Sequence, residues 1–379
     1  MRIGILKENK TELRIAITPN DVKRLVAAKN EVFVCANAGV ANNFLDKQYI
    51  EAGAKIVVNN KKLIETCQVL LKLSAPTSDE SKLLANKIII GHYNLANNPK
   101  TLRSFLTNNI TAIGIEAVNE SGVYTILLPN EQIKGRFAAI LGCYYLSKLN
   151  KNGMGKLFTS ISYNESPAKF VVVNASYAGI EAAKTILSFG ADLTILENNT
   201  NLLDQVHQHH ILHELAKLNK AKLKIVNADY SNLTQYIAGC DVLIYTNSTP
   251  GSLTSKRITN PMITSMNKGG VFVDIAIDQG VSSDDEKRPT KINKPCFVGN
   301  DITHFAFDNV PALFNQTISV AISKLLTDYL LECDHTKNDG AILKHKYLSA
   351  ATLTHRKKIT NKNIATSLRL EYTNLSSIS

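Results

Sequence analysis

The sequence predicts an α/β fold with two doubly wound parallel sheets joined by long helices. The prediction rests on two stretches in which strand-like and helix-like segments alternate, and on a long helical segment between them. Such alternation is typical of parallel sheets, because each strand needs a crossover to reach the next one. A chain of 379 residues also exceeds what one hydrophobic core usually supports, so two domains are expected.

The first alternation begins at the start of the chain. Apolar runs of strand length alternate there with segments of helical periodicity, such as residues 20–28. The expected strands are residues 3–5, 32–34, 56–58, 69–72, 88–90 and 111–115. After Pro129, residues 131–149 form one long helical pattern, which is expected to connect the two domains.

The second alternation starts at residue 170. Strands are expected at residues 170–173, 193–196, 223–226, 242–245 and 271–277, with a helix at 180–188. The last of these strands includes the stretch VDIAIDQG at 273–280, which is interpreted as a buried strand ending in the carboxylate of Asp278, an amide and a glycine. Open α/β sheets present their chemistry at this carboxyl edge, so Asp278 is a candidate catalytic residue.

A degenerate glycine motif follows the first strand of the second alternation. Where Rossmann domains that bind dinucleotides have G-x-G-x-x-G, this chain has Asn174, Ser176 and Gly179. Gly179 keeps the close contact between helix and strand, and Asn174 tolerates the left-handed backbone of the tight turn. Ser176 either crowds a pyrophosphate or offers it a hydroxyl group. An equally open interpretation is a parallel α/β domain that binds no dinucleotide.

Glu197 ends the next strand of this βαβ unit. A carboxylate at this place accepts hydrogen bonds from the ribose hydroxyls and repels the extra phosphate of NADP. The predicted cofactor is therefore NAD.

Composition and charge narrow the class of protein. The apolar content of 44% and charged content of 20% are those of a soluble globular protein, and no apolar run reaches the roughly 18 residues of a membrane span. The chain enters a strand pattern directly after Met1, without a signal peptide, which predicts a cytoplasmic location and no membrane partner. The net charge of +11 comes from lysines spread along the chain without a recognisable motif, so no nucleic-acid partner is expected.

No metal site is expected. The six cysteines are scattered without a Cys-x-x-Cys pair, which suits reduced, mostly buried thiols. His207, His209, His210 and His213 lie in a helical pattern with spacings that metal ligands use. No carboxylate or His-Glu-x-x-His pattern completes a site, so these histidines are interpreted as a solvated helix face.

Eight stretches spread over nearly the whole chain carry a family resemblance. They are MRIGILKENKTELRIAITP at the start, EAGAKIV at 51, LPNEQIKGRFAA at 128, PAKFVVVNASYAGIEAAK at 167, TPGSLTSKRIT at 249, VDIAIDQG at 273, RPTKINKPCFVGNDITHFAFDNVPA at 288 and ITNKNIATSLRL at 359. With them the chain resembles alanine dehydrogenases, which share their architecture with the nucleotide-binding subunit of proton-translocating transhydrogenase.

This resemblance implies both an architecture and an activity. The implied substrate domain comprises residues 1–128 and 310–379, the implied Rossmann domain and its connecting helix comprise residues 129–309, and the active site lies in the cleft between them. The implied activity is that of an NAD-dependent oxidoreductase acting on a small amino acid and its 2-oxo acid. The implied assembly is a homo-oligomer, a hexamer or a dimer.

The resemblance also implies roles for single residues. Arg14 matches the arginine that binds the substrate carboxylate, a task that suits a guanidinium fork. Asp278 matches the active-site aspartate, and Asn309 matches the asparagine of a loop near substrate and nicotinamide. Gly135 and Arg136 match a helix start with a structural role.

Two positions depart from the family pattern. In the family, Lys-Val-Lys-Glu-Pro contributes its second lysine to the substrate; this chain keeps the first lysine as Lys72 and has Ser74 at the substrate-binding position, which removes a charge beside the substrate. Asn94 stands where the family has the catalytic histidine of His-Leu-Ala. An asparagine neither takes up nor releases a proton near neutral pH, and loss of a positioned acid/base costs about 10²–10⁴ in rate. His92 is a candidate to replace the missing acid/base, although two residues of extended chain would displace it from position 94 by roughly 6.6 Å. Asp278 is a second candidate for this proton transfer.

Three function classes therefore stay open. The first is an alanine-dehydrogenase-like oxidoreductase with impaired or altered chemistry. The second is a catalytically inactive protein that retains the fold to bind ligands or partners. The third is a transhydrogenase-like module that needs a membrane partner, which the stretch around Asp278 and the C-terminal match disfavour.

Overall fold

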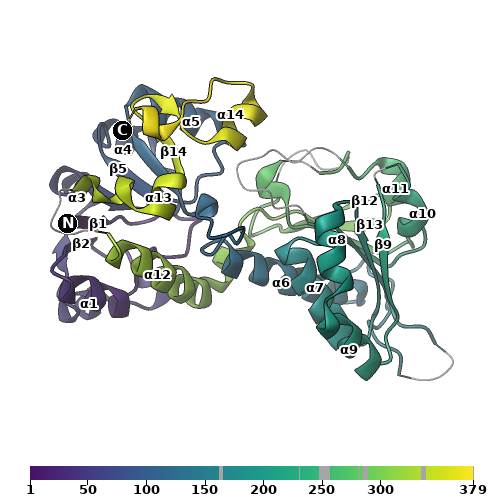
Figure 1. Ribbon diagram of the computed structural model, residues 1–379. Helices are drawn as coiled ribbons and strands as arrows, with labels where there is room; N and C mark the ends of the chain where they lie inside the picture. Colours follow the sequence, from purple (N-terminus) through teal and green to yellow (C-terminus); the bar gives the residue numbers. More distant parts are fainter. Residues whose placement is uncertain are drawn as a thin grey trace. The chain divides into compact units, whose positions relative to one another are not determined.

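The computed structural model describes residues 1–161, 165–229, 231–246, 257–280, 282–284, 289–333 and 339–378. The chain divides into two compact units. Met1–Asn130 and Pro311–Ser379 belong to the first unit, so both chain ends lie there, and Glu131–Thr249 and Thr254–Val310 form the second (Figure 1). The assignment of the first unit as the substrate domain and of the second as the nucleotide domain stays a prediction, because a fold alone does not identify the ligand that it binds.

The first unit is built on an eight-stranded sheet of order β15-β14-β6-β5-β4-β1-β2-β3. Strands β1 to β6 run parallel, whereas β14 pairs antiparallel with β6, and β15 antiparallel with β14. The strands are β1 (Arg2–Ile5), β2 (Glu31–Cys35), β3 (Lys55–Val57), β4 (Val69–Leu71), β5 (Ile88–Gly91), β6 (Thr111–Gly114), β14 (Thr352–His355) and β15 (Lys358–Ile359). The helices are α1 (Pro19–Ala27), α2 (Asp46–Glu51), α3 (Asn60–Thr66), α4 (Ser78–Leu83), α5 (Pro99–Thr107), α12 (Asn315–Leu331), α13 (Lys346–Ala350) and α14 (Lys362–Leu368).

The central strands of this sheet are apolar along their whole length. Every residue of β4 and β5 is buried, because helices cover both faces of a parallel sheet. Helix α12 lies beside α1 and joins the C-terminal part of the chain to the N-terminal part (Figure 1). The hydroxyl oxygens of Ser319 and Ser323 on α12 accept hydrogen bonds from the backbone amides of Ile15 and Thr18, at 3.0 and 2.8 Å.

The second unit holds a seven-stranded sheet of order β12-β13-β11-β10-β7-β8-β9, parallel except for β12. Its strands are β7 (Lys169–Val173), β8 (Asp192–Glu197), β9 (Leu223–Asn227), β10 (Val242–Tyr245), β11 (Val271–Asp274), β12 (Cys296–Gly299) and β13 (Ile302–Phe305). Its helices are α6 (Leu128–Leu146), which begins in the first unit, α7 (Tyr177–Ser188), α8 (Thr200–His207), α9 (His210–Leu218), α10 (Thr234–Ile237) and α11 (Asn260–Thr264). The predicted α/β class with two parallel-dominated sheets is confirmed.

In both sheets the strand order reverses next to the first strand. The chain moves outward from β1 through β2 to β3 and then returns to β4 on the other side, and β7, β8, β9 and β10 repeat this path. Open α/β sheets bind ligands beside the carboxyl ends of the strands at such a switch point. The switch points lie between β1 and β4 in the first unit and between β7 and β10 in the second.

The predicted strand at 271–277 is shorter than expected. β11 ends at Asp274, and Asp278 lies in the short 3₁₀ helix η3 (Ile277–Gln279) instead of at the strand end. The cause is the fully buried carboxylate of Asp274, which accepts hydrogen bonds from the Ala276 amide at 2.8 Å and from the hydroxyl of Ser282. These side-chain bonds replace the sheet ladder and turn the chain before Asp278 is reached.

Gly135 lies inside α6, where the helix packs on α7. A Cβ atom on Gly135 would lie 2.1 Å from the carbonyl oxygen of Ala178, so only glycine fits this contact. Arg136, the next residue, reaches across to Glu181 on α7 with its Nη2 atom 2.8 Å from Oε2. Both residues therefore have the structural role predicted for them, although α6 begins seven residues earlier, at Leu128.

The Gly135→Ala variant is expected to lower the free energy of unfolding by about 1–3 kcal/mol. The clash with the Ala178 carbonyl has this magnitude, and it outweighs the gain of up to about 1 kcal/mol that alanine brings inside a helix. Urea unfolding of the variant measures the loss. Gly299→Ala is the matched control in the same unit, since the nearest atom to its Cβ would be Nε2 of His304, at an ordinary contact distance of 3.5 Å. Equal losses in the two variants would contradict the packing argument.

Candidate functional site

Polar residues gather at the carboxyl edge of the first sheet. Glu8 follows β1, Ser74 follows β4, His92 and Asn94 follow β5, and Glu116 follows β6. Backbone hydrogen bonds hold these extensions together, from the Leu6 amide to the Leu71 carbonyl and from the His92 amide to the Leu73 carbonyl, each 3.0 Å. The candidate residues Ser74, His92 and Asn94 therefore lie at one edge, beside the switch point between β1 and β4.

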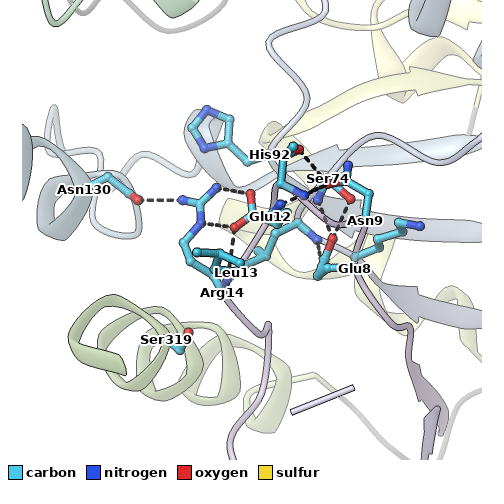
Figure 2. Close-up of polar contacts among 12 residues, drawn as sticks. Glu8, Asn9, Glu12, Leu13, Arg14, Ser74, His92, Asn130 and Ser319 are labelled. Carbon is cyan, nitrogen blue, oxygen red and sulfur yellow. Dashed lines mark hydrogen bonds and ion pairs between the residues drawn. The ribbon is translucent and has the colours of Figure 1, made fainter. Parts of the chain in front are cut away.

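Arg14 is buried in this region and is bound by protein groups on two sides. Its Nε and Nη2 atoms donate to Oε1 and Oε2 of Glu12, each at 2.7 Å, and its Nη1 donates to Oδ1 of Asn130 at 2.9 Å (Figure 2). The fork expected to bind a substrate carboxylate thus faces a carboxylate of the same chain. A substrate on this edge of Arg14 has to share it with Glu12 or displace Glu12.

The Glu8 carboxylate bridges the switch point of the first sheet. Its Oε1 accepts the Leu73 amide at 2.6 Å, and its Oε2 accepts the Ser74 amide at 2.9 Å and the Ser74 hydroxyl at 2.5 Å (Figure 2). Desolvation, and then the negative charge of Glu12, raise the pKa of Glu8 from 4.5 to about 7. The hydrogen bonds from residues 73 and 74 oppose this rise without cancelling it. Sequence reasoning missed Glu8, although the residue lies in the first matching stretch.

Lys72 is the lysine retained from the family pattern, but its ammonium group is already paired within the chain. Its side chain is buried, and Nζ lies 2.7 Å from Oε2 of Glu80 at the start of α4. The Tyr93 hydroxyl donates to the Lys72 carbonyl at 3.2 Å and fixes the backbone there. Lys72 therefore acts as half of a buried ion pair.

His92 and Asn94 contact each other, which corrects the separation expected from an extended chain. The His92 Nε2 atom lies 3.3 Å from Oδ1 of Asn94. β5 ends at Gly91, and Asn94 has a left-handed backbone with φ +43°, so the chain turns back instead of continuing. The amides of Tyr93 and Asn94 both donate to Oε1 of Glu116 at 3.1 Å, which holds this turn. His92 is thus directly beside the position of the missing histidine.

Asp278 is held by an ion pair that the sequence did not reveal. Lys134 on α6 is buried, with its Nζ 3.0 Å from Oδ2 of Asp278 and 3.1 Å from Oε1 of Glu131. Desolvation alone would lower the pKa of Lys134, but the charges of Asp278 and Glu131 outweigh it and raise that pKa. The i,i+3 spacing of Glu131 and Lys134 was the sequence signal for an ion pair between these two residues, because residues three apart lie on the same helix face.

Asn309 lies partly buried in the loop between β13 and the 3₁₀ helix η4 (Val310–Phe314). Partial desolvation, and then the negative charge of Asp278, raise the pKa of its neighbour Asp308. The loop that carries Asn309 therefore comes close to the segment that carries Asp278. Their role toward a substrate stays a prediction.

The degenerate glycine motif lies at the switch point of the second sheet. Asn174 has the left-handed φ of +71° expected for it, and its side-chain amide donates to the carbonyl of Thr246 after β10. A Cβ on Gly179 would lie 2.2 Å from the Asn174 carbonyl oxygen, so glycine is required for this contact of helix and strand. The Ser176 hydroxyl caps α7: it accepts the Gly179 amide at 3.3 Å and donates to the Thr246 hydroxyl at 3.0 Å.

Glu197 ends β8, as predicted, and its carboxylate binds three backbone amides. Oε2 accepts the Ala175 amide at 2.6 Å, and Oε1 accepts the amides of Asn198 and Asn199 at 2.9 and 2.7 Å. The bond to Ala175 ties the end of β8 to the turn after β7. Glu197 is therefore fixed beside the motif, with part of its acceptor capacity already used.

Among the described residues, the cysteines and the histidines at 207–213 are not part of the clusters described above. All six cysteines are free, and Cys35, Cys67, Cys240 and Cys333 are buried, as predicted. The histidine run is divided, because α8 ends at His207 and α9 begins at His210. In the described part of the chain, no group of three or more His, Cys, Asp or Glu residues could hold a metal ion. Among the described helices, none is both long and apolar enough to cross a membrane.

Two models of known protein families match the chain. The family model "Alanine dehydrogenase/PNT, N-terminal domain" matches residues 4–132, and "Alanine dehydrogenase/PNT, C-terminal domain" matches residues 138–362. The chain belongs to the alanine dehydrogenase/PNT family. Alanine dehydrogenase of Staphylococcus epidermidis is 30% identical over 378 residues, covering 99% of both chains. Alanine dehydrogenase 1 of Staphylococcus aureus is 30% identical over 376 residues, covering 98% of both. The predicted family is thus confirmed.

Solved structures agree with this family at the level of the fold. A structure titled L-alanine dehydrogenase has a TM-score of 0.82 and 23% identity, covering 97% of this chain and 99% of that one. A transhydrogenase from Sinorhizobium meliloti has a TM-score of 0.72 and 20% identity, covering 96% and 99%. Both units therefore have the fold of the alanine dehydrogenase/PNT family.

Proposed function

We propose that this protein is an NAD-dependent oxidoreductase that interconverts a small amino acid and its 2-oxo acid, with a proton relay unlike that of its family. The observation that carries the proposal is the cluster at the carboxyl edge of the first sheet. There a buried guanidinium, Arg14, accompanies the titratable side chains Glu8 and His92 in a member of a dehydrogenase family. Substrate carboxylate binding and proton transfer require these two kinds of group.

The residues of the second switch point fit a dinucleotide. The turn from Asn174 to Ser176 leads into α7 through the glycine contact at Gly179, which brings the helix start close to the strand end. Glu197 is the group for the ribose hydroxyls, and its anionic charge selects NAD over NADP. The bound cofactor would supply a two-electron hydride carrier. Ser176 offers a hydroxyl where a glycine motif offers only backbone, so it is the residue that would meet the pyrophosphate.

Three roles toward the substrate follow for the remaining candidates. Arg14 would bind the substrate carboxylate, because a guanidinium fork matches the geometry of that group. Asp278 and Asn309 would orient the amine or the ketone oxygen. Asn94 would position the substrate by hydrogen bonds only, while His92 beside it is one candidate for the proton transfer that Asn94 cannot perform.

A second candidate function is a catalytically inactive protein that binds ligands through the same fold. The bidentate pairing of Arg14 with Glu12 favours it, because the carboxylate fork is already engaged within the chain. The three backbone amides on Glu197 favour it in the same way, because they use acceptor sites that ribose hydroxyls would need.

Titration of the protein with NADH, followed by fluorescence, and then an assay with pyruvate and ammonia separate these functions. Saturable NADH binding together with NADH oxidation that requires both substrates is the expected result. Binding without turnover on pyruvate or on other small 2-oxo acids would support the inactive protein. Absence of both would overturn the proposed oxidoreductase. NADPH serves as the control nucleotide, and its binding is expected to be weaker because Glu197 repels the 2′-phosphate.

A further inference from the structure

Glu8 occupies the switch point of the first sheet, where ligands of open α/β sheets bind. Its carboxylate reaches from the end of β1 to residues 73 and 74 at the end of β4, and the side chain stays partly exposed. The hydrogen bonds that the Glu8 carboxylate accepts come from uncharged donors, the amides of Leu73 and Ser74 and the Ser74 hydroxyl. Within the described residues, no ammonium or guanidinium group forms an ion pair with it.

The nearby cations are paired with other carboxylates. Arg14 forms its bidentate pair with Glu12, and Lys72 forms its buried pair with Glu80. Each of these pairs is neutral overall and Glu116 is a further acidic group at this edge, so an ionised Glu8 adds a negative charge that neither Arg14 nor Lys72 compensates. An anionic substrate carboxylate arriving at Arg14 makes that charge less favourable still, because like charges repel at short range.

The protonation equilibrium of Glu8 agrees with this charge count. Desolvation and the charge of Glu12 place its pKa at about 7, so both the acid and the carboxylate are populated near neutral pH. A general acid or base works best when its pKa lies near the pH of the reaction. Oε1 accepts only the Leu73 amide among the described donors, and an oxygen of this kind has a second lone pair that can hold the proton.

We propose that Glu8 is the proton donor and acceptor of the reaction, in place of the residue that Asn94 has lost. This inference rests on the proposed oxidoreductase function and names the catalytic residue within it. It also explains the two departures from the family pattern, at Ser74 and Asn94, by one altered proton relay. A lysine at position 74 would pair with Glu8 and hold it as an anion, whereas Ser74 only donates hydrogen bonds and leaves Glu8 able to carry a proton.

The proton transfer can be written for reductive amination of a 2-oxo acid. Ammonia adds to the carbonyl carbon and gives a carbinolamine. The Glu8 acid donates its proton to the carbinolamine hydroxyl, the C–O bond breaks with its electron pair on oxygen, and water leaves. The nitrogen lone pair forms the C=N bond of an iminium ion, whose carbon would accept the hydride, with both electrons, that a bound reduced nicotinamide would supply. Glu8 regains a proton from solvent, and the reverse sequence describes amino-acid oxidation.

The Glu8→Gln variant tests this role through the pH dependence of kcat. Wild-type protein is expected to show an ionisation near pH 7 in the reductive direction, with kcat falling as Glu8 loses its proton. Glu8→Gln is expected to lower kcat at pH 7 at least about tenfold and to abolish this ionisation, since a positioned acid/base is worth about 10²–10⁴. The dissociation constant of NADH is expected to stay unchanged. Glu65→Gln, at an exposed position on α3, is the matched control.

His92→Gln distinguishes Glu8 from His92, which is a further titratable side chain at this edge. If the ionisation persists in Glu8→Gln and disappears in His92→Gln, His92 is the proton carrier and the inference is overturned. Wild-type kcat and pH profile in Glu8→Gln would overturn it as well, while leaving the oxidoreductase function intact. Absence of turnover in wild-type protein is instead the failure of the proposed function, and the role of Glu8 fails with it.

Two further readouts keep the inference testable if Glu8→Gln folds poorly. Ser74→Ala removes a hydrogen bond that lowers the pKa of Glu8, and is expected to shift the ionisation to higher pH, whereas Ser74→Lys is expected to shift it to lower pH. An unmoved ionisation in both variants contradicts the assignment. Because the native state holds the Glu8 proton more tightly, the unfolding equilibrium constant should rise by up to about tenfold per pH unit between 4.5 and 7 in the wild type. This contribution is expected to be absent in Glu8→Gln.

Discussion

The Ser74→Lys/Asn94→His double variant is expected to raise kcat for reductive amination of pyruvate about 10²-fold over wild-type protein. A positioned histidine supplies a general acid/base, which is worth about 10²–10⁴ in rate, and Glu8 already restores a part of that in the wild type. The backbone of Asn94 is left-handed, a conformation in which histidine is one of the better tolerated residues. Steady-state kinetics with NADH, pyruvate and ammonia measure the gain.

The single variants separate the two substitutions. Ser74→Lys alone is expected to be slower than wild type at pH 7, because its ammonium group holds Glu8 as an anion while Asn94 still transfers no proton. Asn94→His supplies the missing group in the double variant. A double variant that binds NADH but stays as slow as the wild type would show that these two positions do not explain the altered chemistry.

Lys134→Met is expected to lower the free energy of unfolding by about 3–5 kcal/mol. The substitution removes the ammonium that contacts both Asp278 and Glu131, and breaking a buried ion pair by deleting one partner has a cost of this size. Methionine is unbranched and fills most of the space of the lysine stem, so packing changes little. Urea unfolding at pH 7, followed by circular dichroism, measures the loss.

Arg136→Met is the matched control, two residues further along α6. The Arg136 side chain is 62% exposed, and its partner Glu181 keeps the Lys184 ammonium at 2.7 Å after the substitution. Exposed ion pairs contribute about 0–1 kcal/mol, so this variant is expected to lose no more than that. Similar losses in the two variants would refute the idea that Lys134 is special because its pair is buried.

The first ten strands could be predicted closely from the sequence. β1 to β10 each lie within one residue of the predicted runs, because apolar segments of strand length indicate strands. The edge strands β12 and β15, which are short and partly exposed, were missed, and so were their neighbours β13 and β14. Helix α12 was missed as well, although it completes the first unit.

The candidate site was predicted less completely than the fold. Arg14 was identified by its place in a matching stretch, and Ser74, Asn94 and the neighbouring His92 by their departure from the family pattern, but their partners were not identified. The extended-chain estimate separated His92 from Asn94, whereas a left-handed residue brings their tips to 3.3 Å. Glu8 and Lys134 were quoted only as letters within motifs, because nothing in a local pattern shows that a charged side chain will be buried.

The sequence by itself determined the α/β class, the family and the list of altered positions, because hydrophobic periodicity and motif residues are local properties of the chain. The tertiary structure decided which groups act on which. Glu8 meets Ser74 across 66 positions, and Lys134 meets Asp278 across 144. Charge, burial and hydrogen bonding set the protonation of such groups, and these depend on neighbours that only the folded chain brings together.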